Sequence, residues 1–433
     1  MTSVTQGGSY RSSVATIGVL FFIFGFVTWL NGPLIAFVKL AFDLDTDAKA
    51  FLVTMAFYMA YFFLALPSSW ILVRTGMKRG MAIGLGVMAI GTVVFGTFAT
   101  ARNYPVCLAG LFIIGSGLSL LQTASNPYIS ILGPIESAAA RISVMGICNK
   151  LAGILSPIVF GILVMKDVDH FEGRVAAAAT PEIRTALLNE FAAAVYWPYM
   201  AMALVLVVLA IWIIKSPLPE IRSAEANASG AGGERGSIFQ FPHLWLGVLC
   251  LFLYVGVEVL AGDAIGTYGK GFGLPTSQTA YFPSFTLTGM LIGYVVGLVA
   301  IPKYLSQERG LAISAVLGIV FCICAYVTKG YVSVAFVAAL GLANALMWPA
   351  IFPLAIQGLG RFTETGSALL IMGIAGGALI PSLFARLKDH YDFQLVFLAV
   401  AVPCYLYILF YSLKGYAAGR RHAANAAAAL ATP

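Results

Sequence analysis

The chain has 433 residues, of which 60% are hydrophobic and only 10% are charged. A soluble globular protein carries about 25% charged residues, so this composition excludes an ordinary soluble protein and indicates a polytopic membrane protein. The net charge of +7 would suggest nucleic-acid binding in a soluble chain. In a membrane protein it follows from orientation in the lipid bilayer, and we expect no nucleic-acid partner.

Twelve apolar runs are long enough to cross a bilayer, which takes about 20 helical residues. The sequence therefore predicts an all-α polytopic membrane protein. Runs four and five are the least regular, because Asn126-Pro127 and Gly133-Pro134 interrupt them. In chain order the predicted spans cover residues 14–38, 50–73, 80–99, 105–130, 138–165, 193–214, 243–266, 280–301, 309–328, 331–357, 364–385 and 393–413.

The basic residues set the expected orientation. If the N-terminus is cytoplasmic, the inside segments hold more Lys and Arg than the outside segments, and acids such as Asp43, Asp45 and Asp167 fall outside. Cytoplasmic loops of membrane proteins are enriched in Lys and Arg. We therefore predict that both termini face the cytoplasm.

A polar stretch near the middle of the chain separates six spans from six. Its Ser, Gly, Ala and charged residues are typical of a linker. The predicted organisation is an N-terminal six-helix bundle at residues 1–214, a cytoplasmic linker at 215–240, a C-terminal six-helix bundle at 241–415 and a cytoplasmic tail at 416–433.

The two predicted halves contain similar segments at equivalent places. "RTGMKRGMAIG" after span two resembles "YLSQERGLAIS" after span eight, and "ISVMGICNKLAGILSP" in span five resembles "LLIMGIAGGALIP" in span eleven. Such repeats are typical of transporters whose site lies near the bilayer midplane between the halves. Gly289, Gly293 and Gly297 of span eight indicate either a sliding surface between the halves or static packing.

Three long segments resemble the major facilitator superfamily, specifically its fucose–galactose–glucose:H+ symporter family: "FFIFGFVTWLNGPLI", "LQTASNPYISILGP" and "GSALLIMGIAGGALIP". The similarity extends over residues 18–416. The segments "LQTASNPY", "RISVMGICNK" and "YVGVEVLAGD" are most similar to the bacterial branch for N-acetylglucosamine or glucose uptake. The resemblance implies two pseudo-symmetric six-helix bundles in the bacterial inner membrane that import a sugar together with a cation.

The chain departs from the fucose branch of that family at two positions. That branch carries an acid in span one where this chain has Gly32, and a Glu in span four where this chain has Gln122. Those acids underlie proton coupling in the fucose branch. The same coupling mechanism therefore does not transfer directly to this chain.

Two ionisable residues lie well inside predicted spans, Lys150 in span five and Glu258 in span seven, with Asp263 nearer the outer end of span seven. Buried charges in membranes are costly and usually functional. Three hypotheses follow: a state-dependent ion pair between Lys150 and Glu258; hydrogen bonds from Lys150 to Gln122, Asn149 and the sugar while Glu258 titrates; or a Lys150 charge that replaces a bound cation and leaves a uniporter. Asp263 is a third candidate coupling residue, and a static salt bridge is the structural alternative.

Sugar recognition requires neutral hydrogen-bonding groups and aromatic faces. The sequence offers amide side chains within the spans, with Trp29, Tyr58 and Tyr61 among further candidate aromatic platforms. In the superfamily architecture spans one, four, seven and ten line the cavity. The predicted substrate-binding residues are Asn31, Gln122, Asn126, Asn149, Tyr254, Asn344 and Trp348. A hydrogen bond between helices is the competing interpretation for each amide.

Two basic segments resemble degenerate forms of the superfamily's cytoplasmic loop motif, which latches basic side chains against acids and helix C-termini. The predicted cytoplasmic gate comprises Arg74, Lys78, Arg79 and Arg309, although Arg74 lacks the motif's neighbouring Asp. The alternative is that these basic residues only reflect the general enrichment of Lys and Arg in cytoplasmic loops.

The leading interpretation is a secondary active importer of a hexose or N-acetylglucosamine, coupled to H+ or Na+. The alternatives within transport are a sugar uniporter and an exporter of another small neutral solute. A membrane enzyme would need a nucleophile with its base or a set of metal ligands, and the four histidines lie at span ends, in loops or in the tail. We expect no enzyme activity, no metal or other cofactor apart from the co-transported ion, and a monomer in the lipid bilayer.

Overall fold

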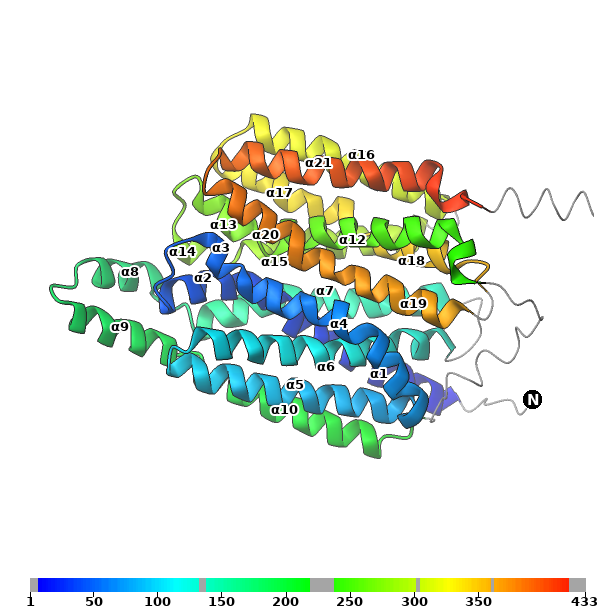
Figure 1. Cartoon of the computed structure of the whole chain (residues 1–433), viewed down its shortest axis with the longest axis horizontal. Helices are drawn as coiled ribbons and strands as arrows, with labels where there is room; N and C mark the ends of the chain where they lie inside the picture. Colours follow the sequence, from blue (N-terminus) through cyan, green and yellow to red (C-terminus); the bar gives the residue numbers. More distant parts are fainter. Residues whose placement is uncertain (1–6, 132–137, 219–236, 301–303, 360–361, 420–433) are drawn as a thin grey trace, which may run out of the picture.

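The structure, a computed structural model, describes residues 7–131, 138–218, 237–300, 304–359 and 362–419. All regular elements in these ranges are helices, and twelve helical segments are long and apolar enough to cross a membrane. The long helices run side by side along the long axis of the molecule (Figure 1). The predicted all-α class with twelve spans is confirmed.

The first six spans are built from α1 to α10. Their helices pack through glycines: a Cβ on Gly84 of α5 would lie 2.7 Å from the carbonyl oxygen of Gly117 in α6. Only a residue without a side chain permits that approach. The bounds are α1 Gly7–Trp29, α2 Asn31–Ala41, α3 Asp47–Ala50, α4 Leu52–Thr75, α5 Met77–Thr100, α6 Tyr104–Ile131, α7 Ala138–Leu163, α8 Val168–Ala176, α9 Pro181–Ala193 and α10 Tyr196–Lys215.

The last six spans begin after a short 3-10 turn and end near residue 413. The bounds are η3 Ile238–Gln240, α12 Pro242–Gly262, α13 Ile265–Lys270, α14 Thr276–Thr279, α15 Phe282–Ala300, α16 Gln307–Val327, α17 Gly330–Asn344, α18 Met347–Ile356, α19 Thr363–Met372, η5 Gly373–Ala375, α20 Gly376–Lys388, α21 Phe393–Leu413 and η6 Gly415–Ala417. Residues 219–236, most of the predicted linker, and residues 420–433 of the predicted tail lie outside the described residues.

Among the described spans, three are interrupted near the middle of their length. The first is broken at Leu30 between α1 and α2, the tenth at Ala345–Leu346, and the eleventh by the 3-10 turn η5. Interrupted spans free backbone groups that must find partners, so transporters use them where a span meets an internal cavity or the other repeat.

The glycine row of span eight packs within the second half. A Cβ on Gly289 would lie 3.2 Å from the Ala338 carbonyl of α17, and one on Gly293 would lie 2.5 Å from Ala345. This row therefore gives static packing, and the sliding surface considered from the sequence is not located there. Gly146 of α7 does face the other half, because its Cβ would lie 2.8 Å from the ring of Tyr294 in α15.

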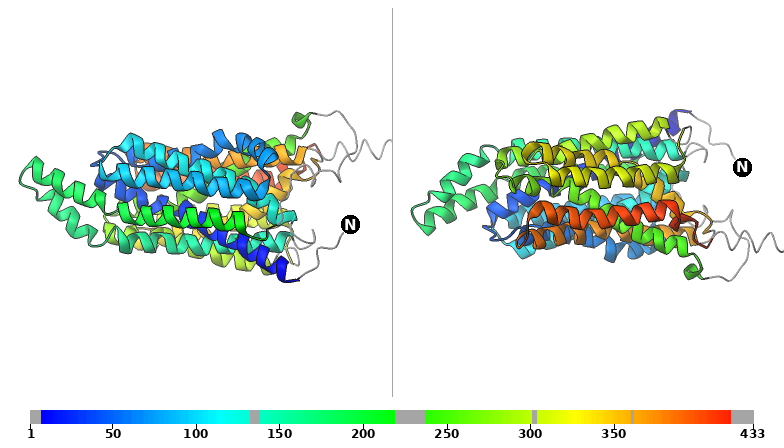
Figure 2. Two further views of the ribbon diagram at one scale, coloured as in Figure 1. Left: turned by 90° about the horizontal axis from the view of Figure 1, so that it is seen from below. Right: turned by 90° about the horizontal axis from the view of Figure 1, so that it is seen from above.

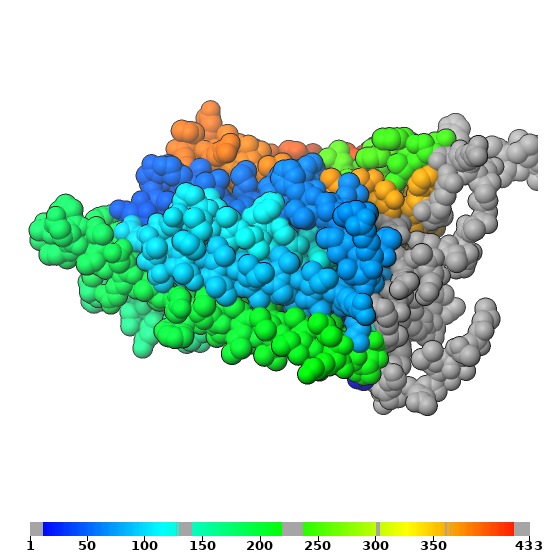
Figure 3. Space-filling view, turned by 60° about the horizontal axis from the view of Figure 1, so that its bottom comes forward, coloured from blue at the N-terminus to red at the C-terminus, as the bar shows by residue number. Residues whose placement is uncertain are grey.

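One end of the molecule carries the start of α1 and the end of α21, and the opposite end carries the α8–α9 hairpin (Figure 1). We call these the terminal end and the hairpin end. The hairpin projects beyond the other helices in the turned ribbon views and in the space-filling view (Figures 2 and 3).

At the hairpin end, polar contacts join the two halves. Asp47 of α3 binds Lys39 in its own half and Lys388 of α20 in the other half. Burial alone would raise the pKa of Asp47, but Lys388 and Lys39 outweigh burial and hold that pKa below its ordinary value of 3.8. We call this set the Asp47 clasp.

The α8–α9 hairpin makes a second set of contacts between the halves. Thr276 of α14 donates to Glu172 of α8 at 2.7 Å, and Lys270 lies 3.5 Å from the same carboxylate. The backbone N–H of Ser277 donates to Asp169 at 3.0 Å. Together with the Asp47 clasp, these contacts close the hairpin end.

Candidate functional site

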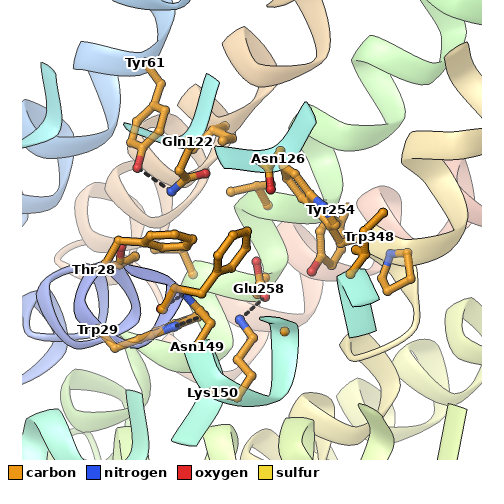
Figure 4. Close-up of a pocket in the computed structure, with 18 of the residues that line it drawn as sticks. Thr28, Trp29, Tyr61, Gln122, Asn126, Asn149, Lys150, Tyr254, Glu258 and Trp348 are labelled. Atoms are coloured by element: carbon orange, nitrogen blue, oxygen red, sulfur yellow. Dashed lines mark hydrogen bonds and ion pairs between the residues drawn. The ribbon is translucent and has the colours of Figure 1, made fainter. Parts of the chain in front are cut away.

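A cavity with a free volume of about 120 Å³ lies between the two halves. Ligand pockets for drug-sized molecules typically measure about 300–1,000 Å³, so this cavity is narrow for a ligand of that size. The wall comprises Phe21, Phe24, Thr28, Trp29, Tyr58, Tyr61, Gln122, Asn126, Ile142, Gly146, Asn149, Lys150, Tyr254, Val255, Glu258, Val259, Tyr294, Trp348, Pro349 and Ile374. Figure 4 draws most of them and labels the main polar and aromatic ones.

Lys150 and Glu258 form an ion pair in the wall of this cavity. The ammonium of Lys150 on α7 lies 2.9 Å from a carboxylate oxygen of Glu258 on α12 (Figure 4). The two residues are only 6% and 7% exposed. One charge comes from each half, and the pair therefore connects the halves at the level of the cavity.

Trp29 supports the lysine. The Lys150 ammonium lies 4.4 Å from the centre of the Trp29 ring, a cation–π distance. The indole N–H of Trp29 also makes a long hydrogen bond, 3.5 Å, to the side-chain oxygen of Asn149. Glycines make room for the ring: a Cβ on Gly153 would lie 2.6 Å from Trp29, and one on Gly262 would lie 2.5 Å away.

Three of the predicted amides line the cavity: Gln122, Asn126 and Asn149 (Figure 4). The Gln122 amide nitrogen donates to the hydroxyl of Tyr61 at 2.9 Å. Asn149 donates a long bond of 3.4 Å to the carbonyl of Phe21. Each amide offers both a donor and an acceptor, the combination that a neutral polyhydroxylated ligand requires.

Aromatic rings form the remaining walls. Tyr254 and Trp348, both predicted, lie with ring centres 6.5 Å apart on the second-half side. Tyr58 and Tyr61 stack on the first-half side with centres 6.4 Å apart. The Tyr254 hydroxyl lies within electrostatic reach of Glu258 but has no hydrogen-bond partner of normal geometry in the described part of the chain.

Two predicted amides do not line this cavity. Asn31 is buried and donates to the carbonyl of Thr28 at 3.0 Å. Asn344 accepts a hydrogen bond from Tyr405 at 2.9 Å, which joins α17 to α21. The contact of Asn344 is a hydrogen bond between helices, whereas the contact of Asn31 is local to the break between α1 and α2 in its own span.

The candidate gate residues lie near the terminal end. The Arg74 guanidinium stacks on Trp70 at 3.7 Å, and Lys78 donates to the carbonyl of Ser216 at the C-terminus of α10. Both contacts stay within the first half. Arg79 and Arg309 are exposed. The contact of Lys78 with a helix C-terminus is of the kind that the basic loop motif makes.

Sequence reasoning missed part of the wall. Thr28, Phe21, Phe24 and Tyr294 line the cavity without having been predicted. Spans two, five, eight and eleven contribute to the wall alongside spans one, four, seven and ten. Nothing in the sequence distinguishes Tyr294 from the tyrosines of the hydrophobic core.

Comparison with known proteins identifies the class. The sequence profile described as Major Facilitator Superfamily matches residues 17–380. A protein of Brucella abortus named "Glucose/galactose transporter" is 34% identical over 417 residues, 96% of each chain. The "L-fucose-proton symporter" of Escherichia coli is 29% identical over 89% of this chain and 88% of its own.

A solved structure gives the same result for the fold. The crystal structure of the superfamily transporter FucP in the outward conformation matches with a TM-score of 0.74 and 25% identity, over 93% of this chain and 98% of that one. The chain therefore belongs to the major facilitator superfamily, in its fucose–galactose–glucose:H+ symporter family. The expected class, a multi-pass transporter of the bacterial inner membrane and not an enzyme, is confirmed by these relatives.

Proposed function

We propose that this protein imports a hexose or N-acetylglucosamine across the inner membrane by alternating access, coupled to H+. The relatives named for glucose, galactose and fucose favour a monosaccharide. The observation that carries the proposal is the cavity between the halves, whose wall combines three amides, several aromatic rings and one buried ion pair. N-acetylglucosamine is included because three segments are most similar to that branch.

The ion pair is the proposed coupling element. Protonation of Glu258 would remove its charge and release Lys150, whose three N–H donors then become available to the sugar and to Asn149. Separating the halves also requires breaking this pair, because the two residues lie in opposite halves. Of the three hypotheses from the sequence, the state-dependent pair agrees best with the 2.9 Å contact, while Na+ coupling and uniport are the alternatives that the transport assay tests.

The conformation fits one stage of such a cycle. The hairpin end is closed by the Asp47 clasp and the α8 contacts, while the cavity lies nearer the middle of the spans, where residues 21–29 of α1, 142–150 of α7 and 254–259 of α12 line it. With both termini in the cytoplasm, as we propose from the charge distribution, the structure is closed to the outside. The transporter would work as a monomer without a cofactor beyond the transported ion, and the basic segments near Arg74 and Arg309 would hold the cytoplasmic side when it closes.

Counterflow in proteoliposomes tests the proposal. Purified protein loaded with unlabelled glucose, galactose or N-acetylglucosamine should accelerate entry of the same labelled sugar. An inward H+ gradient should then drive accumulation above equilibrium, while a Na+ gradient of equal size should not. Labelled mannitol, a linear polyol without a pyranose ring, serves as the negative control. Absence of counterflow with all three sugars would refute sugar transport, and equal responses with and without gradients would identify a uniporter.

A further inference from the structure

Asp263 is a buried carboxylate that the ion pair does not use. It caps the C-terminus of α12, directly after Gly262, and is 1% exposed. Neither carboxylate oxygen has a hydrogen-bond partner of normal geometry among the residues that the structure describes. Burying an ionised carboxylate without partners costs several kcal/mol, so this arrangement needs an explanation.

The carboxylate lies against the start of α2 in the other half. A Cβ on Gly32 would lie 3.4 Å from Oδ1 of Asp263 and 2.9 Å from Pro283. Gly32 is the second residue of α2, an eleven-residue helix that is separated from α1 by the break at Leu30. A helix N-terminus carries about half a positive charge, which compensates an ionised carboxylate only in part.

The charges around Asp263 do not balance if it is ionised. The groups that act on it are Glu258 on its own helix, Lys150 of α7, the Tyr58 hydroxyl of α4 and the backbone N–H of Gly32, which points toward the carboxylate without a hydrogen bond of normal geometry. Lys150 is the one cation among them, and it is already paired with Glu258 at 2.9 Å. One positive charge would therefore face two carboxylates. A single proton on Asp263 restores neutrality.

The contact also depends on the conformation. Gly32 belongs to the first half, Asp263 and Pro283 belong to the second, and all three lie on the hairpin side of the ion pair, where the halves are closed. A conformation with the hairpin end open would separate the halves at this place and expose Asp263 to water, whereas in the closed conformation Asp263 is 1% exposed.

We propose that Asp263 is a proton site that controls closure of the hairpin end. The carboxylate takes up one H+ from the outer solution while that end is open, and the neutral acid is the form that closure buries. When the end reopens, the proton returns to the outer solution. This role is separate from Glu258, and it rests on alternating access but not on the identity of the sugar.

Distances between spin labels test the proposal without any sugar. Thr185 of α9 and Val332 of α17 are exposed at the hairpin end in opposite halves, so labels on T185C and V332C, with the native cysteines replaced, report its opening. In the wild-type background the closed population should increase as the pH falls from about 9 to 5. A single linked proton allows at most a tenfold change in the closed-to-open ratio per pH unit.

In D263N, which mimics the protonated acid, the closed-to-open ratio should stay high and change less than about twofold over the same range. D263S serves as a second neutral variant if D263N does not fold, as judged by size-exclusion chromatography. The matched control is D45N, because Asp45 is an exposed acid whose partner Lys49 lies in its own half. A wild-type ratio that does not change with pH, or a D263N ratio that changes like the wild type, would overturn the proposal.

The result is independent of the proposed coupling. If the wild type shows no H+-driven accumulation, the coupling proposal is refuted, but the measurement of closure still tests the proton site. Conversely, a normally coupled transporter whose closure ignores Asp263 would refute only the proton site.

Discussion

The ammonium of Lys150 and the carboxylate of Glu258 lie 2.9 Å apart although 108 residues separate them in the chain. They come from α7 and α12, one helix of each half, and the Trp29 ring lies beside the lysine at 4.4 Å. A buried pair of this kind is weak evidence for stability, because desolvation offsets much of the attraction. Its position between two halves that must separate in transport makes the pair a candidate switch instead.

Removing either charge of the pair should cost more than removing both. E258Q leaves a buried lysine and K150M leaves a buried carboxylate, and each should lower the free energy of unfolding by about 3–5 kcal/mol. The double variant K150M/E258Q should recover most of that loss. Thermal unfolding in detergent measures the cycle. Additive losses would mean that the two residues do not interact energetically.

The same E258Q variant should abolish accumulation driven by H+ while counterflow continues. The substituted amide has no titratable proton but retains the shape of the side chain. Uptake under a pH gradient, divided by counterflow rate in the same vesicles, measures the effect and corrects for the amount of folded protein. Normal accumulation in both E258Q and K150M would contradict the proposed coupling.

The Asp47 clasp should stabilise closure of the hairpin end. K388A removes the contact of the clasp between the halves and should raise the open population several-fold. An exposed ion pair contributes about 0.2–1 kcal/mol, and this partly buried pair should contribute more. K49A is the matched control, because Lys49 binds Asp45 within one half. The labels on T185C and V332C measure both variants, and an equal response would exclude the clasp as a gate.

Strong acid should release this clasp. The pKa of Asp47 is lowered in the closed structure, so its contribution is fully present above the ordinary value of 3.8 and is lost as the pH falls through the lower, closed-state pKa. The open population should therefore increase below about pH 4, in the opposite direction to the change expected from Asp263 between pH 9 and 5. D47N should abolish the response to strong acid and leave the response between pH 9 and 5 in place.

The cavity amides should differ from the packing amides. Q122A removes a group that lines the cavity and should raise the sugar concentration for half-maximal counterflow about three- to tenfold, the equivalent of roughly one hydrogen bond. N344A breaks the contact with Tyr405 and should mainly lower the melting temperature, with little change in sugar affinity. The opposite pattern would place the sugar near Asn344.

A side chain at position 153 should displace the Trp29 ring. In G153A the new Cβ would lie 2.6 Å from the ring, so the indole must move away from Lys150, and sugar counterflow should fall several-fold. G86A is the control, since nothing lies within 4 Å of a Cβ at that position. A G153A protein with unchanged counterflow would show that the position of the ring is not required.

Much of the site could be predicted from the chemistry of single residues in apolar surroundings. Lys150 and Glu258 stand out because charges inside membrane spans are costly. Gln122, Asn126, Tyr254 and Trp348 stand out because they lie in spans expected to face a cavity, and Asn149 because it is an amide within a span, next to Lys150. The sequence left open whether the two charges meet. Asn31 and Asn344 have the same chemistry as the cavity amides, so only their neighbours distinguish them.

The sequence by itself determined the membrane class, the twelve spans and the family, because these depend on hydropathy and on local segments such as "LQTASNPYISILGP". The tertiary structure decided which residues face each other across the two halves: Lys150 with Glu258, Asp47 with Lys388, and Asp263 with the start of α2. Those contacts depend on helix rotation and on how closely the halves approach. A hydropathy pattern fixes which segments enter the lipid, but not which faces they turn toward one another.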